Sequence, residues 1–364
     1  MRVVIAPDKF AGTLTAVEAA DAVADGWSRR APADDLQLVP MSDGGTGFVD
    51  VLHAALGGEL LAVTVPSPYG DPVPAAILMV GDTAYVESAQ AVGLHLTPAD
   101  QRDPENGSSR GVGELISHAI ASGARRIVIG LGGTATNDAG AGLLAALGAT
   151  SEGGSLTKGA AGLVPLTGVD LTPARALVAG VDLVAASDVD TQLLGLIGAT
   201  KVFGPQKGVT EDRLVTVDGW LQHFAELTDR KVASGKGAGA AGGIGFALLL
   251  LGATRTPGVD LVADAVELAQ KVKGADLVIT GEGSFDFSSG SGKVPYGVAA
   301  IAAQALAPCI ALAGQVLVGS REMRTLGVES AYSMVDLVGK DRALGDARES
   351  LALLAERTAR TWSR

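Results

Sequence analysis

Four polar, glycine-rich loops each follow a predicted strand, and they carry most of the residues that could do chemistry. They are residues 8–13 (Asp-Lys-Phe-Ala-Gly-Thr), 42–47 (Ser-Asp-Gly-Gly-Thr-Gly), 132–138 (Gly-Gly-Thr-Ala-Thr-Asn-Asp) and 281–286 (Gly-Glu-Gly-Ser-Phe-Asp), the last running on to Lys293. Open α/β sheets bind ligands outside the carboxyl ends of their strands, where such loops lie. Their carboxylates and lysines are the groups that phosphoryl transfer to a hydroxyl uses.

The loop at residues 132–138 has the composition most suited to phosphate. It contains a glycine pair, two hydroxyls, an amide and a carboxylate: Gly132, Gly133, Thr134, Thr136, Asn137 and Asp138. A strand, this loop and a helix N-terminus in succession place several backbone N–H groups in one concavity that can bind an anion. An ordinary loop whose Thr and Asp cap the next helix explains the same residues, and both interpretations stay open.

Residues 291–293 (Ser-Gly-Lys) resemble the end of a P-loop, but the match is incomplete. Phe287 stands at the required first glycine, and Val294 replaces the required Ser or Thr. Lys293 still lies beside a glycine and just before a helix that Pro295 would open. It is either a substrate or phosphate contact or a solvated surface lysine.

Residues 237–242 (Gly-Ala-Gly-Ala-Ala-Gly) match the dinucleotide-binding pattern letter by letter. That pattern needs a buried strand before it, and here the polar residues 231–236 precede it. A glycine-rich loop that opens a helix at 244–251 is the better interpretation.

Two further segments combine charged and hydroxyl side chains. Ser109 and Arg110 open a predicted helix with a hydroxyl and a guanidinium, an arrangement that suits an anion. Asp188 follows a predicted strand at 181–186, and Lys207 comes soon after it. The second group is either a surface ion-pair cluster or a site for a nucleotide phosphate and its metal.

Composition excludes several classes of function. Lys plus Arg number 28 and Asp plus Glu number 40, so the net charge is 28 − 40 = −12, which argues against nucleic acid or an anionic membrane as partner. The single Cys309 excludes an intramolecular disulfide and a multi-cysteine metal site. All four histidines are expected away from the polar loops, which disfavours a Ser-His-Asp hydrolase or a His-ligated metal. The N-terminal segment lacks the pattern of a signal peptide, so we expect a cytoplasmic protein.

The hydrophobic pattern alternates strand and helix at both ends of the chain but not in the middle. Thr15 and Glu18 have capping-box spacing before a helix at 16–29. In the middle, strands at 60–65, 73–80 and 83–87 follow one another without helices, and Gly81-Asp82 is a hairpin signal. We therefore expect an α/β protein with a doubly wound, Rossmann-like parallel-sheet domain and a second, mixed α/β domain inserted into it. The expected domains are 1–65 with 285–364, and 66–284.

Taken in order, these motifs resemble one family closely, the bacterial-type glycerate kinases with a Rossmann-like domain and an inserted domain. The resemblance covers nearly the whole chain, and the run at 132–138 is its most specific part. It lies in residues 6–8 with 14–16, 43–45, 109–111 with 113–115, 132–138, 188–189, 203–208, 237–243, 281–283 with 286, and 292–295.

The resemblance implies transfer of the γ-phosphate of ATP, with Mg²⁺, to D-glycerate in the cleft between two domains, usually giving 2-phosphoglycerate. It implies small-molecule partners only, in a monomer or homodimer. We expect Asp188 and Lys293 to be catalytic, and Ser109, Arg110 and Lys293 to bind substrate. The expected nucleotide-binding residues are Gly132, Gly133, Thr134, Thr136, Asn137, Lys207 and Gly283, with Asp43 and Asp138 holding Mg²⁺ through the nucleotide.

The chain departs from the family pattern at three loop positions. Ala11 stands where a Lys is frequent, although Lys9 lies two residues earlier. Thr46 stands where Glu is usual, and Ser284 where Arg is usual. Two other functions compete with a kinase: an NAD-dependent oxidoreductase, which rests on residues 237–242 alone, and a two-domain protein that binds a small acid.

Overall fold

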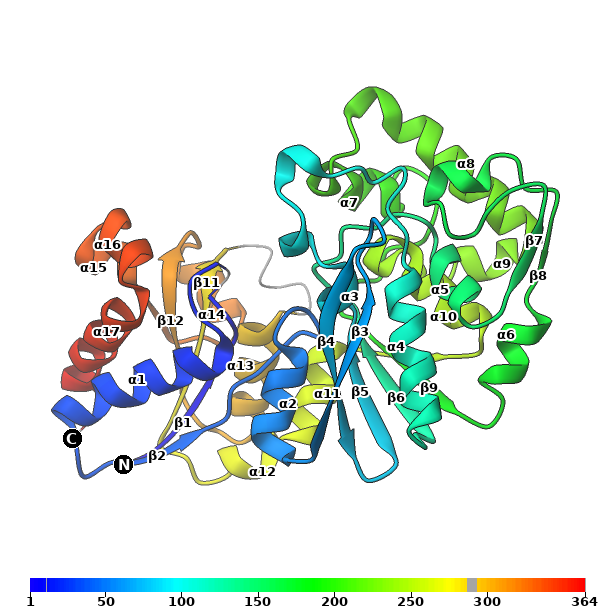
Figure 1. Cartoon of the computed structure of the whole chain (residues 1–364). Coiled ribbons are helices and arrows are strands. Elements are labelled where there is room, and N and C mark those ends of the chain that lie inside the picture. Colours follow the sequence, from blue (N-terminus) through cyan, green and yellow to red (C-terminus); the bar gives the residue numbers. More distant parts are fainter. Residues whose placement is uncertain (11, 287–292, 364) are drawn as a thin grey trace. The chain divides into compact units, whose positions relative to one another are not determined.

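The computed structural model describes residues 1–10, 12–286 and 293–363 (Figure 1). The chain forms two compact units. Unit 1 comprises Met1–Asp43, Asp50–Gly57 and Pro257–Arg364, and unit 2 comprises Gly44–Val49 and Gly58–Thr256. Among the described residues, no helix is both long enough and apolar enough to span a membrane.

A parallel sheet in the order β13–β12–β11–β1–β2 forms the centre of unit 1. Its strands are β1 (Arg2–Pro7), β2 (Asp35–Leu38), β11 (Leu277–Phe285), β12 (Cys309–Val316) and β13 (Ser330–Ser333). The side chains of β1 after Arg2 are buried, as expected of a central parallel strand that is covered on both faces. This sheet confirms the predicted α/β class.

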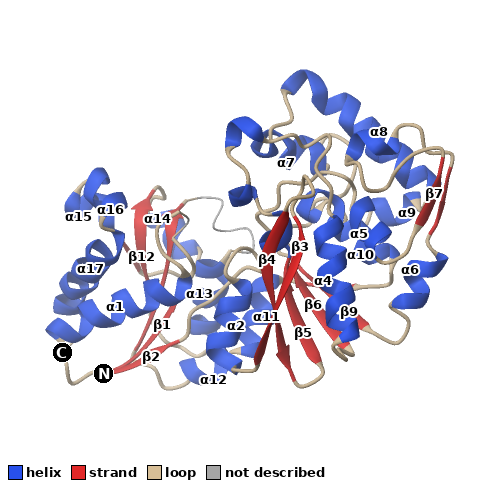
Figure 2. Ribbon diagram, in the orientation of Figure 1, coloured by secondary structure: helices blue, strands red, loops and turns tan. Residues whose placement is uncertain are grey.

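Helices cover both faces of this sheet (Figure 2). Val3, Ile5 and Leu312 pack with α1 and α17 in one hydrophobic cluster, whereas α13 contacts β1, β11 and β12. The helices of unit 1 are α1 (Ala16–Arg30), most of α2 (Phe48–Leu56), α11 (Gly258–Ala265), α12 (Leu268–Val272), α13 (Val294–Gln304), α14 (Ser320–Thr325), α15 (Met334–Val338), α16 (Lys340–Gly345) and α17 (Ala347–Trp362).

The N-terminal and C-terminal helices of unit 1 pack tightly together. The predicted capping box begins α1, because Thr15 Oγ1 accepts from the Glu18 N–H at 3.1 Å and the Glu18 carboxylate accepts from the Thr15 N–H at 2.8 Å. Gly26 lets α1 approach α17 closely, since a Cβ there would lie 1.9 Å from the carbonyl oxygen of Ala352.

The sheet of unit 2 has the order β10–β9–β6–β5–β4–β3. Its first part is the predicted antiparallel meander, in which Val80 pairs with Thr83 across the Gly81-Asp82 turn. From β5 onward the strands are parallel. The strands are β3 (Glu59–Pro66), β4 (Pro72–Val80), β5 (Thr83–Glu87), β6 (Arg126–Gly130), β9 (Asp182–Ala186) and β10 (Thr254–Thr256), with a separate hairpin of β7 (Thr150–Glu152) and β8 (Gly168–Asp170).

Helices and an apolar core accompany this sheet. Phe224 and Phe246 meet edge to face at 6.2 Å in the core. The helices of unit 2 are α3 (Ser88–Val92), α4 (Arg110–Ala121), α5 (Ala141–Ala146), α6 (Thr172–Leu177), α7 (Ala199–Lys207), α8 (Leu214–Leu227), α9 (Arg230–Ala233) and α10 (Ile244–Leu250).

Besides Gly44–Val49, which belongs to unit 2, the units differ from the expected domain boundaries at 65/66 and 284/285 in two places. Residues 59–65 belong to unit 2, because β3 pairs along its length with β4. Residues 257–284 belong to unit 1, because β11 pairs with β1. Both corrections follow from strand pairing, which a local hydrophobic pattern does not specify.

Candidate functional site

The strand order of unit 1 points to a ligand site between β1 and β11. In the sheet, β2 lies on one side of β1, whereas β11 and the strands that follow it lie on the other side of β1. The strand order therefore reverses between β1 and β11. Doubly wound sheets bind ligands at such a reversal, outside the carboxyl ends of the strands. A pocket of about 460 Å³ lies there, lined by residues that follow or end these strands. We call it the unit 1 pocket.

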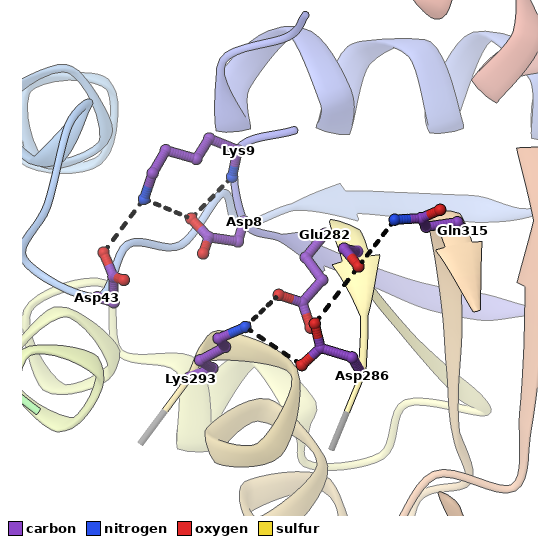
Figure 3. A network of polar contacts seen from close by, with 8 residues as sticks. Asp8, Lys9, Asp43, Glu282, Asp286, Lys293 and Gln315 are labelled. Carbon is purple, nitrogen blue, oxygen red and sulfur yellow. Dashed lines mark hydrogen bonds and ion pairs between the residues drawn. The ribbon is translucent and has the colours of Figure 1, made fainter. Parts of the chain in front are cut away.

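Asp8 and Lys9 follow β1 and form one wall of the unit 1 pocket (Figure 3). The Asp8 N–H donates to the carbonyl of Gly281 at 2.8 Å, which ties this loop to β11. The Asp8 carboxylate accepts a hydrogen bond from the Lys9 N–H at 2.7 Å and lies 3.6 Å from the Lys9 ammonium. The same ammonium lies 3.2 Å from a carboxylate oxygen of Asp43, after β2. Lys9 therefore joins the ends of two neighbouring strands.

The carboxyl group of Asp8 is suited to proton transfer. Its side chain is only 9% exposed although it lines the pocket. Burial raises the pKa of Asp8 to about 7, and the Lys9 ammonium offsets only part of that effect. A carboxyl group that titrates near neutral pH can both accept and release a proton there, unlike an ordinary aspartate with a pKa of ~3.9.

Glu282 and Lys293 lie on another wall of the pocket (Figure 3). Glu282 is on β11, and Lys293 immediately precedes α13. The Lys293 ammonium lies 3.7 Å from Glu282 Oε2 and 3.8 Å from Asp286 Oδ1. These are ion-pair distances rather than short hydrogen bonds, so the ammonium can turn its N–H groups toward a bound anion.

Polar groups at the ends of β11 and β12 also line the unit 1 pocket. Gln315 Nε2 donates to Ser284 Oγ at 3.2 Å, and that hydroxyl lies 3.4 Å from Asp286. Gly283, predicted to contact the nucleotide, lines the same pocket. Ala11 and residues 287–292, which include the predicted Ser-Gly pair before Lys293, lie outside the described residues.

The unit 1 pocket therefore combines lysines with carboxylates. Cations stabilise charge on a transferring phosphoryl group, and carboxylates can take a proton or bind Mg²⁺ through oxygen. Within the described ranges, no cluster of three or more His, Cys, Asp or Glu side chains is arranged to hold a metal ion. Carboxylate oxygens such as those of Asp43, which lines the pocket, are of the kind that binds Mg²⁺.

In unit 2, the glycines of the predicted phosphate loop pack against a second glycine loop. A Cβ at Gly132 would lie 2.8 Å from Gly45 Cα, and a Cβ at Gly130 would lie 2.5 Å from the Gly44 carbonyl oxygen. Gly133 has φ +64, a conformation that favours glycine. Close packing within unit 2 explains why glycines stand at these positions without a bound phosphate.

The side chains that follow this glycine pair are buried. Thr134, Thr136, Asn137 and Lys207 each expose at most 2% of their surface. The Lys207 ammonium donates to Thr134 Oγ1 at 3.1 Å and to the Thr136 carbonyl at 2.6 Å. Burial lowers the pKa of Lys207 to about 7, although Asp138 acts in the opposite direction. The structure brings these predicted nucleotide ligands together, but in the interior, where they hold the loop itself.

Two atoms of this loop keep hydrogen-bonding capacity. Thr136 Oγ1 and Asn137 Oδ1 are buried and have no hydrogen-bond partner among the described residues. Asn137 Nδ2 donates to Thr200 Oγ1 at 3.0 Å, which fixes the orientation of the amide. Buried polar atoms of this kind usually bind an ordered water.

Asp138 and Ser109, which were predicted to contact metal and substrate, bind each other in the interior. The fully buried Asp138 carboxylate accepts hydrogen bonds from the N–H and the hydroxyl of Ser109, both at 2.8 Å. It also accepts from the N–H groups of Gly140 and Gly142 at 3.1 and 3.2 Å. Burial raises the pKa of Asp138, and these hydrogen bonds oppose the rise. Both oxygens thus bind groups at the N-termini of α4 and α5, and the roles predicted for Asp138 and Ser109 in binding metal and substrate remain predictions.

Arg110 and Asp188 are accessible, and their predicted roles remain predictions. The Arg110 side chain is 54% exposed and pairs with Glu114 at 2.8 Å. Asp188 lies two residues after β9 and is partly exposed. Arg110 is the more exposed of the two, since one carboxylate oxygen of Asp188, Oδ2, is buried.

The glycine run at 237–242 packs against the loop that contains Asn137. A Cβ at Gly242 would lie 2.0 Å from the Thr136 carbonyl oxygen, and a Cβ at Gly243 would lie 2.3 Å from Ala139 Cα. The Ala139 N–H donates to the Gly242 carbonyl at 3.1 Å. The element before this run is helix α9, not a strand. Packing therefore accounts for the pattern that suggested an oxidoreductase.

Sequence reasoning missed two features of these loops. The buried Glu87 carboxylate accepts from the N–H groups of Gly47 and Val49 at 3.1 and 3.3 Å, which ties the 44–49 segment to the end of β5. The sequence signal that could have indicated this role was the position of Glu87 at the end of the predicted strand 83–87. The expectation that every histidine lies away from the loops was wrong for His95, because the neighbouring Leu94 N–H donates to the Gly133 carbonyl at 2.8 Å.

The chain is similar along its whole length to known proteins. A sequence model of the glycerate kinase family matches residues 3–363. A glycerate kinase from Bacillus subtilis (strain 168) is 42% identical over 370 residues, which cover 99% of this chain and 96% of the relative. A glycerate 2-kinase from Escherichia coli (strain K12) is 38% identical over 372 residues, which cover 99% and 98%.

A solved structure agrees with this similarity. It is a crystal structure of a glycerate kinase 2 from Salmonella typhimurium LT2, at 37% sequence identity and a TM-score of 0.81. The match covers 99% of this chain and 98% of that chain.

Proposed function

The chain belongs to the glycerate kinase family, and on this premise we propose that it transfers the γ-phosphate of ATP to D-glycerate, with Mg²⁺ bound through the nucleotide, and releases 2-phosphoglycerate. The protein is a glycerate kinase, a phosphotransferase whose acceptor is an alcohol group. The observation that carries the ATP-dependent part of the proposal is the unit 1 pocket, where Lys9 and Lys293 lie beside carboxylates at the carboxyl ends of a doubly wound sheet.

Local positive charge is required because the substrates are anions and the chain carries a net charge of −12. Lys9 and Lys293 supply that charge in the unit 1 pocket, where their present carboxylate partners hold them in place. When a phosphoryl group enters, each ammonium exchanges part of its ion pairing for contact with phosphate oxygens. We therefore propose the unit 1 pocket, rather than the buried loop at 132–138, as the site of the nucleotide phosphates.

The acceptor hydroxyl must lose its proton as the phosphoryl group transfers, and kinases commonly place a carboxylate beside that oxygen. We keep Asp188 as the proposed base. Asp8 is the competing candidate, because its buried carboxyl group lines the unit 1 pocket and has a pKa of about 7. Arg110 is proposed to bind the glycerate carboxylate, since its guanidinium is accessible.

The proposal is tested with ATP, Mg²⁺ and D-glycerate, by measuring ADP release and identifying the product with phosphorus NMR. We expect ADP to form only when glycerate is present, and the product to be 2-phosphoglycerate. Formation of 3-phosphoglycerate would contradict the regiochemistry alone. Absence of glycerate-dependent ADP would contradict the proposed reaction. We also propose that the reaction takes place in the cytoplasm, which fractionation of cells would test.

A further inference from the structure

The unit 1 pocket is longer than a three-carbon acid requires. Its lining begins at Asp43, after β2, and extends to Met334 at the end of β13. In the described sheet, β2 and β13 are separated by β1, β11 and β12. Neighbouring strands lie ~4.8 Å apart, so the ends of β2 and β13 are separated by roughly 19 Å. The cavity of about 460 Å³ lies within the range of sites for drug-sized ligands, ~300–1,000 Å³.

The character of the lining changes along this length. At the β2, β1 and β11 end it consists of charged side chains, among them Lys9 and Glu282 (Figure 3). At the β13 end it consists of Met334 and Val335 of α15 with Ala343 and Leu344 of α16, and Lys340 at the start of α16 is the one charged residue described there. The polar Gln315 lies between these ends, on β12. The pocket therefore has a charged end and a predominantly apolar end, which we call the apolar end.

The apolar end is continuous with the core beneath it. Phe10 and Met334 belong to the same hydrophobic cluster, and each exposes only 2% of its surface. Leu344 lines the same end of the pocket and is 57% exposed. An apolar ligand in contact with these side chains would bury the exposed surface of Leu344. Glycerate, a small polyol acid, offers no surface that would do so.

We propose that this apolar end, formed by Met334, Val335 and Leu344, binds the adenine base of ATP, with the polyphosphate extending toward Lys9 and Lys293. The identity of the nucleotide rests on the proposed function. Along its length, a nucleoside triphosphate has an apolar ring, a hydroxyl-bearing ribose and a chain of anionic phosphates. The lining of the pocket changes in the same order, from apolar through polar to charged side chains. Gln315 lies where an amide would meet the ribose hydroxyls.

Photolabelling with 8-azido-ATP, whose reactive group is on the base, tests the placement directly on the wild-type enzyme. We expect the label on tryptic peptides 325–340 and 343–348, which contain Met334, Val335 and Leu344. Excess unlabelled ATP should suppress this labelling. Label confined to other peptides, such as the one that contains residues 132–138, would overturn the proposal.

Leu344→Gln tests the energetic role of the apolar end, with Leu306→Gln as a matched control. Leu306 is also an exposed leucine of unit 1, 93% accessible, and does not line the pocket. We expect Leu344→Gln to raise the Kd of a fluorescent ADP carrying N-methylanthranilate on its ribose by about fivefold or more. Inhibition by inorganic tripolyphosphate, which has no base, should change by less than about twofold in both variants.

Equal weakening of the fluorescent ADP and of tripolyphosphate by Leu344→Gln, or no weakening of either, would contradict the assignment. The melting temperatures of both variants show whether the fold is intact. The wild-type glycerate assay separates this proposal from the proposed function. If glycerate is phosphorylated but the label lies elsewhere, only the adenine assignment fails. If peptides 325–340 or 343–348 are labelled but glycerate is not phosphorylated, only the proposed reaction fails.

Discussion

The ammonium nitrogen of Lys207 lies 2.6 Å from the carbonyl oxygen of Thr136, in the interior of unit 2. Lys207 is 2% exposed, so its charged form is destabilised by the loss of solvation. This burial lowers the pKa of Lys207 to about 7. The contact fastens α7 to the loop after β6. A residue that sequence reasoning assigned to ATP thus has a role in stability.

We expect the stability of the wild type relative to Lys207→Met to increase from pH 7 to pH 9. Above pH 7 the folded chain holds a neutral Lys207, whereas the unfolded chain keeps this proton until its pKa of ~10.4. The unfolded state therefore binds more protons in this window, and the difference in unfolding free energy rises by up to ~1.4 kcal/mol per pH unit. Urea unfolding at several pH values measures it. Lys273→Met, at an exposed lysine, is the control, and parallel pH curves for wild type and Lys207→Met would contradict the prediction.

Lys293→Ala should lower kcat/KM at least tenfold with little change in the melting temperature. Its side chain is 34% exposed and lines the unit 1 pocket, and a charge-assisted contact to an anion contributes ~1.5–3 kcal/mol. Steady-state kinetics with ATP and glycerate give the value. Lys273→Ala in the same unit is the matched control and should behave as wild type. Wild-type kcat/KM in Lys293→Ala would make Lys293 a surface charge.

Arg110→Ala should also lower kcat/KM about tenfold, but through the KM for glycerate rather than for ATP, because its proposed partner is the glycerate carboxylate. The Arg110–Glu114 pair is exposed and contributes little to stability. Glu114→Gln removes that pair while keeping Arg110, so it should leave kcat/KM unchanged. An equal loss in Glu114→Gln would indicate that the ion pair, not the guanidinium, matters.

Asp188→Asn should lower kcat by about the 10²–10⁴-fold that is typical of a lost general base. Glycerate binding should persist, because Asn keeps the shape of the side chain. Rapid-quench measurement of the first turnover separates chemistry from product release. A raised KM with kcat preserved would make Asp188 a binding residue. Full activity in Asp188→Asn, together with a large loss of kcat in Asp8→Asn, would transfer the role of base to Asp8.

Gly242→Ala should destabilise the protein strongly, because the added Cβ would lie 2.0 Å from the Thr136 carbonyl oxygen and φ is +69. Gly219→Ala is the control: it lies in α8, nothing lies within 4 Å of its Cβ position, and it should gain ~0.5–1 kcal/mol of helix stability. Thermal unfolding gives both values. If Gly242→Ala melts at the wild-type temperature, close packing does not explain this glycine.

The alternation of elements was predictable from local pattern, and long-range pairing was not. The capping box at Thr15 and the turn at Gly81-Asp82 depend on residues a few positions apart, and both were confirmed. The pairing of Ile5 with Ile279 joins distant parts of the chain. It depends on which of several apolar strands become neighbours in the sheet, and the local sequence pattern does not specify this. The boundary expected between residues 284 and 285 therefore falls inside β11, whereas the units divide before this strand, at Thr256/Pro257.

The candidate site was predictable as a set of loops but not as a set of accessible side chains. Asp43, Gly283 and Lys293 were expected to act and do line the unit 1 pocket. Ser109 and Asn137 were expected to contact ligands and are fully buried. Their hydroxyl and amide chemistry suits a ligand and a buried hydrogen bond equally well. Only the tertiary structure decides between these uses.

The close contact of α1 with α17 has a consequence for how the protein is made. All strands of the second sheet lie between residues 59 and 256, so unit 2 can assemble while the ribosome is still translating the rest. The strand β1 is synthesised before unit 2 but pairs with β11 only when β11 has been made, and α1 packs only when α17 has been made, with Arg29 of α1 paired to Glu349 of α17 at 2.7 Å. Nascent unit 1 thus exposes the apolar stripe of its first helix until α17 has been synthesised, and during this interval that stripe can bind chaperones.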